Sequence, residues 1–329
     1  MREPAFWWRE AGLAAALLTP LAAVYGAAAA RRMARPGQSA GVPVVCVGNF
    51  TLGGAGKTPT ALMLAKMLGE AGERVFCLSR GYGGGEAGPR LVDAHNDRAA
   101  DVGDEALLLA RVAPTIVSPD RVAGAALARA QGASVIVMDD GLQNSTLTKD
   151  FTIAVVDGER GIGNGKVFPA GPLRAPIEDQ LARTDAMLAV GAGDVARNVR
   201  ARAPSLPVWH GRLVPDLAAV GELKGRRVLA FAGIGHPEKF FATARMAGLD
   251  IARCRGFPDH HRFSAEEAAA LIMAAEHEGL ALLTTEKDRA RMAGDPLTET
   301  LAKRAHVLPV AMVVAEHDEL RAKVLSMLR

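Results

Sequence analysis

The feature that most constrains the fold is a glycine-rich loop at residues 48–58, GNFTLGGAGKT, between an apolar β-branched run and a segment of helical periodicity. Its glycines let backbone N–H groups turn inward around phosphate oxygens. Lys57 can reach the β- and γ-phosphates, and the Thr58 hydroxyl can coordinate Mg²⁺. Thr51 stands where the strict GxxxxGK(S/T) pattern has its first glycine. The loop predicts a nucleoside triphosphate site formed by Gly53, Gly54, Ala55, Gly56, Lys57, Thr58 and Pro59.

A second segment supplies acids for the same site. Residues 135–140 read VIVMDD, an apolar strand that ends in two carboxylates. A carboxylate at the carboxyl end of such a strand can hold Mg²⁺ directly or through water. Neighbouring strand residues point to opposite faces, so one acid of the pair is expected to face the metal. We expect Asp139 to be that acid, with Asp140 beside it.

The rest of the chain alternates between apolar strands and helices, which predicts parallel sheets covered on both faces. Between residues 204 and 215 we expect a linking pair of strands. The sequence predicts an α/β fold with an N-terminal membrane-anchoring helix at 1–36, a P-loop domain with a parallel sheet at 37–215, and a smaller α/β domain at 216–329. Predicted strands lie at 42–47, 74–78, 115–117, 135–138, 153–156, 186–190, 228–232, 251–255, 281–284 and 307–314, and predicted helices at 58–71, 105–112, 123–130, 237–247, 265–278 and up to 328.

The N-terminal anchor is predicted from an uncharged run at residues 11–30, which is long enough to cross a bilayer. Ten of these residues are Ala and Pro20 interrupts the run, which weakens a spanning helix. A cleaved signal peptide conflicts with a nucleotide site that needs cytosolic ATP. We favour an interfacial anchor; an Ala-rich helix packed on the protein's own core is the alternative. The aromatic and basic anchor residues are Phe6, Trp7, Trp8, Tyr25, Arg9, Arg31, Arg32 and Arg35.

Charge and cysteine content exclude other classes. Lys and Arg total 39 against 36 Asp and Glu, a net charge of +3 that does not indicate nucleic-acid binding. Residues 1–36 hold five Arg and two Glu, so this excess of three equals that of the whole chain. The three cysteines, Cys46, Cys77 and Cys254, form no CxxC motif and are expected to be reduced core residues.

Two sequence details disfavour nucleotide switches and partner-moving ATPases. Position 52 is Leu, where some ATPases carry a second loop lysine, and residues 284–288, TTEKD, lack the spacing of the guanine motif (N/T)KxD. Polar clusters at 79–83, 103–105 and 257–261 could instead supply the base, the cations and the acceptor surface that a small-molecule kinase needs. A P-loop chaperone or regulatory ATPase acting on a protein partner is the alternative.

Nine motifs in order resemble the tetraacyldisaccharide 4′-kinase family of lipid A assembly, over residues 42 to 292. They are GNFTLGGAGKTPT, SRGYGG, DVGDEALLLA, DRVAGA, MDDGLQ, GNGKVFPAGPLR, FAGIGHPEKFF, FPDHHRF and LLTTEKDRARM. The resemblance implies ATP-dependent phosphorylation of the 4′-hydroxyl of a tetraacyl glucosamine disaccharide 1-phosphate, with Mg²⁺. It also implies a location on the cytoplasmic face of the inner membrane, peripheral or monotopic, with the membrane surface and the lipid substrate as partners.

The resemblance also implies roles for individual residues. Asp104 would be the general base, and domain closure would bring His260 toward it; Arg174 would stabilise the transferring phosphoryl group. Glu105 would join Thr58, Asp139 and Asp140 near Mg²⁺. The family motifs further imply nucleotide or substrate contacts by Arg80, Tyr82, Arg121 and Gln143.

Several alternatives stay open at these positions. Residues 103–105 also suit a plain helix N-terminus, and residues 259–261 suit a metal cluster. Lys287 and Asp288 are compatible with a solvated charge pair. The family usually has His where this chain has Asn144 and Glu where it has Ala175. Either His260 or His261 could face the cleft.

Overall fold

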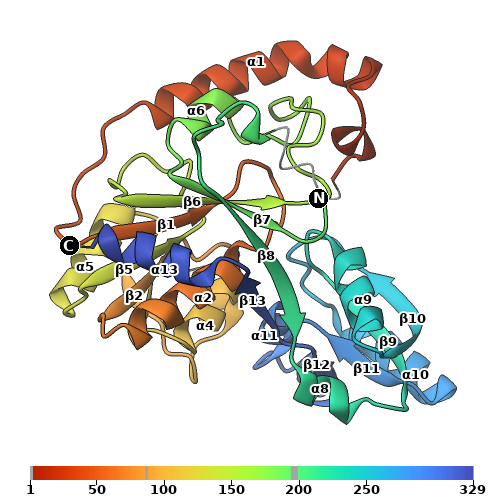
Figure 1. Ribbon diagram of the computed structural model, residues 1–329. Coiled ribbons are helices and arrows are strands. Elements are labelled where there is room, and N and C mark those ends of the chain that lie inside the picture. Colours follow the sequence, from red (N-terminus) through yellow and green to blue (C-terminus); the bar gives the residue numbers. More distant parts are fainter. Residues whose placement is uncertain (1–2, 86–87, 194–198, 329) are drawn as a thin grey trace.

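A nine-stranded sheet forms the larger unit of the computed structural model, which describes residues 3–85, 88–193 and 199–328. The strand order is β13-β8-β7-β6-β1-β5-β2-β4-β3, parallel except where β3 and β13 pair at the two edges. The central strands are buried along their whole length because helices cover both faces (Figure 1). The strands are β1 (Val44–Gly48), β2 (Val75–Ser79), β3 (Arg90–Leu91), β4 (Thr115–Val117), β5 (Val135–Asp139), β6 (Phe151–Asp157), β7 (Ala186–Val190), β8 (Val208–Pro215) and β13 (Val310–Val314).

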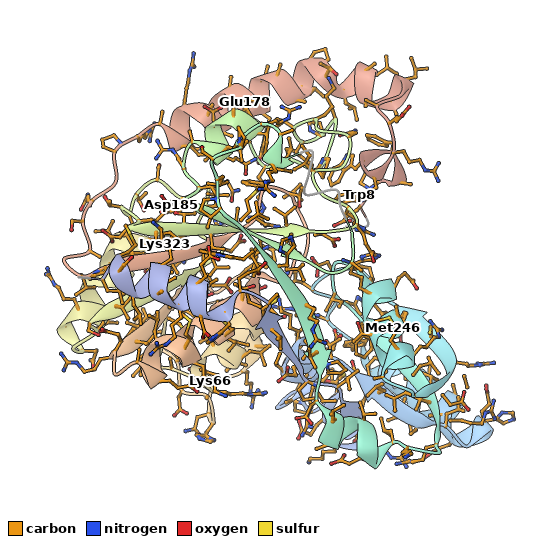
Figure 2. All side chains as sticks on the ribbon, viewed as in Figure 1. Trp8, Lys66, Glu178, Asp185, Met246 and Lys323 are labelled. Atoms are coloured by element: carbon orange, nitrogen blue, oxygen red, sulfur yellow. The ribbon has the colours of Figure 1, made fainter. Side chains whose placement is uncertain are left out.

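Two apolar layers hold this sheet. On one face α2, α4 and α13 pack over a cluster that includes Leu68, Leu109 and Leu320. On the other face α5 packs over Ile136. Lys66 of α2 and Lys323 of α13, both labelled in Figure 2, are exposed. The helices of this unit are α2 (Lys57–Glu70), α3 (Ala99–Val102), α4 (Asp104–Ala110), α5 (Arg121–Ala130), α6 (Ile177–Leu181) and α13 (His317–Ser326).

The second unit contains a four-stranded parallel sheet in the order β10-β9-β11-β12. Its core includes Phe231, Phe263 and Leu271 on one side and Phe241 and Leu283 on the other. Its elements are α8 (Leu217–Glu222), β9 (Arg227–Ala232), α9 (Pro237–Met246), β10 (Asp250–Gly256), α10 (Ala265–Glu278), β11 (Ala281–Thr284), α11 (Glu286–Met292), α12 (Glu299–Arg304) and β12 (His306–Val307).

The N-terminal segment lies along the larger unit. A short 3₁₀ helix, η1 (Ala5–Trp8), precedes α1 (Leu13–Met33), which runs above α6 (Figure 1). The side of α1 that contains Gly26 and Ala29 packs on residues 167–176. The opposite side exposes four apolar side chains by 62–77%, and α1 is long and apolar enough to cross a membrane. The exposed side chains are Leu13, Leu17, Leu21 and Val24.

The prediction that aromatic side chains anchor the N-terminal segment in the membrane surface is wrong for Trp7 and Tyr25. Trp7 is buried, its Nε1 donates to the Pro169 carbonyl over 3.0 Å, and its ring packs edge-on against Phe168. Tyr25 packs against the same phenylalanine. These rings therefore attach the N-terminal segment to the protein itself, as the alternative interpretation expects for this face. Arg2, one of the five arginines within residues 1–36, lies outside the described residues.

Four further expectations differ from the structure. Residues 204–215 contain the single strand β8 (Val208–Pro215), not a strand pair, and β8 joins the large sheet. The predicted strand at 307–314 divides around Pro309, which lacks an N–H donor. Its second part, β13, pairs with β8, so residues 310–326 pack on the larger unit and not in a second domain at 216–329. Cys254 is exposed because β10 is an edge strand, whereas Cys46 and Cys77 are buried.

Candidate active site

The phosphate loop follows β1 and leads directly into α2. Gly53 and Gly56 both have φ of +94°, a left-handed conformation that favours glycine. The buried Lys57 Nζ donates to the Gly53 carbonyl over 3.3 Å, and Asn49 Nδ2 donates to the same oxygen over 3.1 Å. Burial lowers the pKa of Lys57, opposed by the charge of Asp140. The lysine is thus folded back across its own loop, where phosphates are expected to bind.

The adjacent acids Asp139 and Asp140 have opposite environments. Asp139 ends β5, and both of its carboxylate oxygens are buried without a hydrogen-bond partner. Burial, with the nearby carboxylates of Glu105 and Asp140, raises the pKa of Asp139 to about 7. Asp140 has φ of +52° and turns aside, where Arg174 Nη1 donates to both of its oxygens over 2.9 and 3.0 Å. Burial is outweighed there by the charges of Lys57 and Arg174, which hold the pKa of Asp140 well below its ordinary value.

The predicted magnesium ligands lie close together. Thr58 Oγ1 donates to Glu105 Oε1 over 3.3 Å, and the charge of Glu105 acts on Asp139. No group of three or more His, Cys, Asp or Glu side chains spaced to hold a metal occurs among the described residues. Mg²⁺ ordinarily keeps several waters and uses one or two carboxylates plus phosphates. The unpartnered carboxylate of Asp139, with Thr58 and Glu105, therefore fits a hydrated Mg²⁺.

The other acid pair, Asp104 and Glu105, begins α4 and meets cations from the second unit. Lys287 Nζ lies 2.6 Å from Glu105 Oε1, and Arg291 Nε lies 2.9 Å from Asp104 Oδ2. Burial would raise the pKa of Asp104, but His260 and the charge of Arg291 hold it well below its ordinary value. Lys287 has a raised pKa because the carboxylates of Glu105 and Asp104 outweigh its burial. Interpreting Lys287 and Asp288 as a solvated charge pair is therefore wrong.

His260 is the histidine that faces this pair. Its Nδ1 lies 3.7 Å from Asp104 Oδ1, and its ring packs edge-on against Tyr82. His261 turns away, with Nε2 2.8 Å from Glu267 Oε2 and its ring stacked on Phe257. The loop before α10 thus separates the two histidines, and one of them enters the site.

The four predicted contact residues divide into two kinds. Arg121 is buried and Nη1 donates to the Ser118 carbonyl over 2.8 Å; burial lowers its pKa to about 10 against the pull of Asp140. Gln143 Nε2 donates to the Asn49 carbonyl over 2.8 Å and to a glutamine of α6. Tyr82 and Arg80 are exposed. The exposed pair is open to a ligand, whereas the buried Arg121 and the half-buried Gln143 support the loops around the acids.

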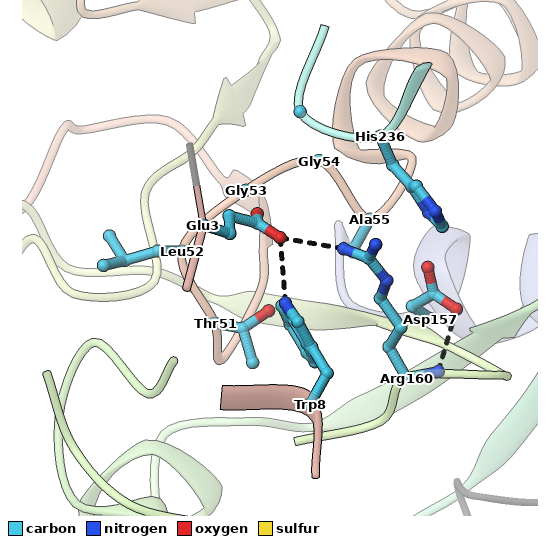
Figure 3. Close-up of a pocket in the computed structure, with 11 residues that line it drawn as sticks. Glu3, Trp8, Thr51, Leu52, Gly53, Gly54, Ala55, Asp157, Arg160 and His236 are labelled. Atoms are coloured by element: carbon cyan, nitrogen blue, oxygen red, sulfur yellow. Dashed lines mark hydrogen bonds and ion pairs between the residues drawn. The ribbon is translucent and has the colours of Figure 1, made fainter. Parts of the chain in front are cut away.

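A small pocket lies on the outer side of the phosphate loop (Figure 3). It is lined by Gly53, Gly54, Ala55, Trp8, Arg160 and His236, from four parts of the chain. The Glu3 carboxylate lies at its edge, 3.0 Å from Trp8 Nε1 and 2.8 Å from Arg160 Nη1. A side chain at Gly53 would collide with this carboxylate. The N-terminal segment therefore reaches the nucleotide loop directly.

The model of a protein family described as LpxK, tetraacyldisaccharide-1-P 4′-kinase, matches residues 14–329 of this chain. The chain belongs to this family. A tetraacyldisaccharide 4′-kinase of Rhodopseudomonas palustris strain BisB5 is 56% identical over 98% of this chain and 95% of its own length. One from Methylobacterium sp. strain 4-46 is 55% identical over 100% of this chain and 98% of its own.

A solved structure supports the fold. A crystal structure of LpxK from Aquifex aeolicus in complex with ATP superposes with a TM-score of 0.73 and 24% identity, covering 96% of this chain and 99% of that chain. The α/β fold with a mostly parallel sheet is therefore confirmed.

The two departures from the tetraacyldisaccharide 4′-kinase motifs have local causes. Asn144 Oδ1 accepts from the Thr146 backbone N–H over 3.1 Å and shapes the turn after Gln143. Ala175 is fully buried against Ala29 and Met33 of α1. A carboxylate at position 175 would be buried among apolar groups, so α1 packing explains the small residue there.

Lys287 and Arg291 are the main site residues that sequence reasoning missed. Both lie in the family motif LLTTEKDRARM, four residues apart on one face of α11. Their motif was the available signal, but nothing in it indicates which carboxylates they meet. Asn49 was missed as well, although it lies inside the loop motif and supports Gly53.

Proposed function

We propose that the chain transfers the γ-phosphoryl group of ATP to the 4′-hydroxyl of a tetraacyl disaccharide 1-phosphate. The observation that carries the proposal is the approach of His260 Nδ1 to within 3.7 Å of Asp104 Oδ1, next to Glu105, which accepts a hydrogen bond from Thr58 of the phosphate loop. A phosphate-binding loop alone would also suit a switch or a chaperone, but a buried carboxylate beside a histidine is suited to proton removal from an acceptor. The name of the family and the ATP bound in the Aquifex aeolicus structure support the donor and the acceptor class.

The chemistry can be assigned to residues of this chain. Asp104 Oδ1 accepts the proton of the 4′-hydroxyl, whose oxygen forms a bond to the γ-phosphorus as the bond to the β,γ-bridging oxygen breaks and ADP leaves. His260 orients Asp104 from the second unit. Lys57 contacts the β- and γ-phosphates, and Arg174 stabilises charge on the transferring group. Mg²⁺, held by Thr58, Glu105 and Asp139 with Asp140 nearby, would neutralise phosphate charge when bound.

A transfer assay tests the function. Wild-type protein with γ-labelled ATP and a tetraacyl disaccharide 1-phosphate should label the lipid. Asp104→Asn should lower turnover at least about 10²-fold with ATP binding unchanged, as loss of a general base predicts. ATP hydrolysis with no label on the lipid would overturn the proposal and favour the chaperone or regulatory ATPase.

We also propose that α1 attaches the enzyme to the cytoplasmic face of the inner membrane through its exposed apolar side. Leu17 and Leu21 lie on that side, within the exposed stripe of the helix. Leu17→Asp with Leu21→Asp should reduce liposome flotation strongly, because charged groups disfavour insertion. Met246→Asp is the matched control, since Met246 is exposed on the outside of the second unit (Figure 2). Equal flotation of all three proteins would contradict this attachment.

A further inference from the structure

Arg291 makes an unusually complete set of contacts between the two units. Its Nε and Nη2 both donate to the same oxygen of Asp104, Oδ2, with the Nε bond at 2.9 Å. Its Nη1 donates to the Gly233 carbonyl over 2.6 Å and to Asp288 Oδ1 over 2.9 Å. The side chains of Arg291 and Asp104 are only 7% and 2% exposed. The guanidinium group therefore donates to three residues, and two of its nitrogens donate to the same oxygen of Asp104.

The groups that hold Arg291 are themselves fixed. Asp288 is fully buried, and its two oxygens each accept from the Gly233 N–H over 3.1 Å. The Thr285 hydroxyl, which caps α11, also donates to Asp288 over 2.7 Å. A Cβ at Gly233 would lie 2.9 Å from the Cβ of His261, so the backbone packs tightly at this point. This rigid support gives the arginine a single orientation.

The two oxygens of Asp104 consequently have different partners. Oδ2 receives both guanidinium donors, whereas Oδ1 lies 3.7 Å from His260 Nδ1 and receives none from Arg291. We propose that Arg291 is a positioning residue, which occupies Oδ2 so that Oδ1 is presented to the acceptor hydroxyl. This inference rests on the proposed function of Asp104 as the proton acceptor.

The geometry favours positioning over simple stabilisation. Burying an ion pair costs desolvation energy, so such a pair is weak grounds for inferring stability. Two donors of one rigid, planar guanidinium that converge on the same carboxylate oxygen hold that oxygen in place. Arg291 reaches the acid from the second unit, so Asp104 is oriented only while the two units are in contact.

The test compares Arg291→Gln with Arg289→Gln, an exposed arginine two residues away on the same helix. Arg291→Gln should lower kcat about 30-fold while KM for ATP stays within about twofold, because the acid is misoriented but the nucleotide loop is intact. Arg291→Lys should recover about a third of that loss on a logarithmic scale, since one ammonium replaces part of the fork. Arg289→Gln should keep wild-type kcat. A wild-type kcat for Arg291→Gln would overturn the proposal.

A double-mutant cycle separates positioning from folding and from the proposed function. If Arg291 acts through Asp104, then Asp104→Asn with Arg291→Gln should have the kcat of Asp104→Asn alone. If the loss of kcat in the double variant equals the product of the two single-variant losses, Arg291 acts elsewhere and the inference is overturned. If Arg291→Gln fails to fold, the double variant and Arg291→Lys still decide the question. Full activity of Asp104→Asn would instead overturn the proton-acceptor role itself.

Discussion

Two acid pairs lie in this site, and they are neutralised from different places. Asp139 and Asp140 follow β5, and the cations beside Asp140, Lys57 and Arg174, belong to the same nine-stranded unit. Asp104 and Glu105 also belong to that unit, but their cations come from α11 of the second unit. The phosphate end of the site (Asp139 and Asp140) therefore has its cations within one unit, whereas the proposed proton-accepting end (Asp104 and Glu105) is paired with cations of the other unit.

The difference has a consequence for catalysis. A nucleotide can meet its loop, Lys57 and Asp139 without any contact between the units. Under the role proposed for Asp104, this acid would be oriented only when α11 and the loop that carries His260 rest against α4. Such an arrangement would confine phosphoryl transfer to the form in which the two units are in contact.

The largest expected effect comes from breaking the self-contained end. Lys57→Ala should lower turnover at least about 10³-fold and weaken ATP binding, because it removes the cation that meets the phosphates. Lys66→Ala, on an exposed turn of the same helix, is the matched control and should stay near wild type. Isothermal titration with ATP and the lipid transfer assay measure both quantities. An active Lys57→Ala enzyme would refute the phosphate-loop assignment.

Asp139 tests the same end through stability. Its folded-state pKa of about 7 is above the unfolded value, so the folded protein holds a proton that the unfolded chain releases. Stability should therefore fall as pH rises from about 4 to 7, and Asp139→Asn should remove that loss. We expect urea unfolding in EDTA at pH 8 to give Asp139→Asn a free energy of unfolding on the order of 2 kcal/mol above that of wild type. At pH 4 the two proteins should differ little.

The control for that measurement is Asp250→Asn, an exposed acid at the edge of the second sheet. It should show no gain at either pH. If Asp139→Asn is no more stable than wild type at pH 8, ionisation of the buried Asp139 carboxylate does not destabilise the folded protein. The same variant should also lose Mg²⁺-dependent transfer, so a gain in stability accompanies a loss of function.

The proton-accepting end is tested by removing the other cation of α11. Lys287→Gln should lower turnover about tenfold, because Glu105 loses a buried partner at 2.6 Å. Lys303→Gln removes an exposed lysine paired with Glu299 and is the matched control. ATP affinity should change less than turnover in Lys287→Gln. An equal loss in both would mean that the two ends are not separable in the way described above.

The parts of the site that sequence reasoning found are those formed by contiguous residues. The phosphate loop joins a strand to a helix, and its glycines, Lys57 and Thr58 are adjacent along the chain, so spacing alone predicts their meeting. Asp139 was predicted because an apolar strand ends on it. The structure keeps both within one or two residues of the predicted boundaries.

The parts that were missed depend on contacts between distant segments. Nothing local indicates that β13 returns to pair with β8 across the sheet, because an apolar strand suits either unit. Lys287 lies 182 residues after Glu105, and its sequence neighbours are charged, which is typical of a solvated helix face. The meaning of such residues emerges only when tertiary packing brings the two units together.

The smallest expected effect concerns Glu3, which brings a negative charge to the otherwise self-contained phosphate end. Its carboxylate lies against Gly53 of the phosphate loop and pairs with Arg160. It therefore places a negative charge near the loop where phosphates are expected to bind. Glu3→Gln should tighten ATP binding about two- to threefold, because partial screening leaves a modest repulsion to remove. Glu10→Gln, exposed in the same segment, should bind ATP like wild type. Weaker ATP binding in Glu3→Gln would show that this carboxylate supports the loop instead of opposing the nucleotide.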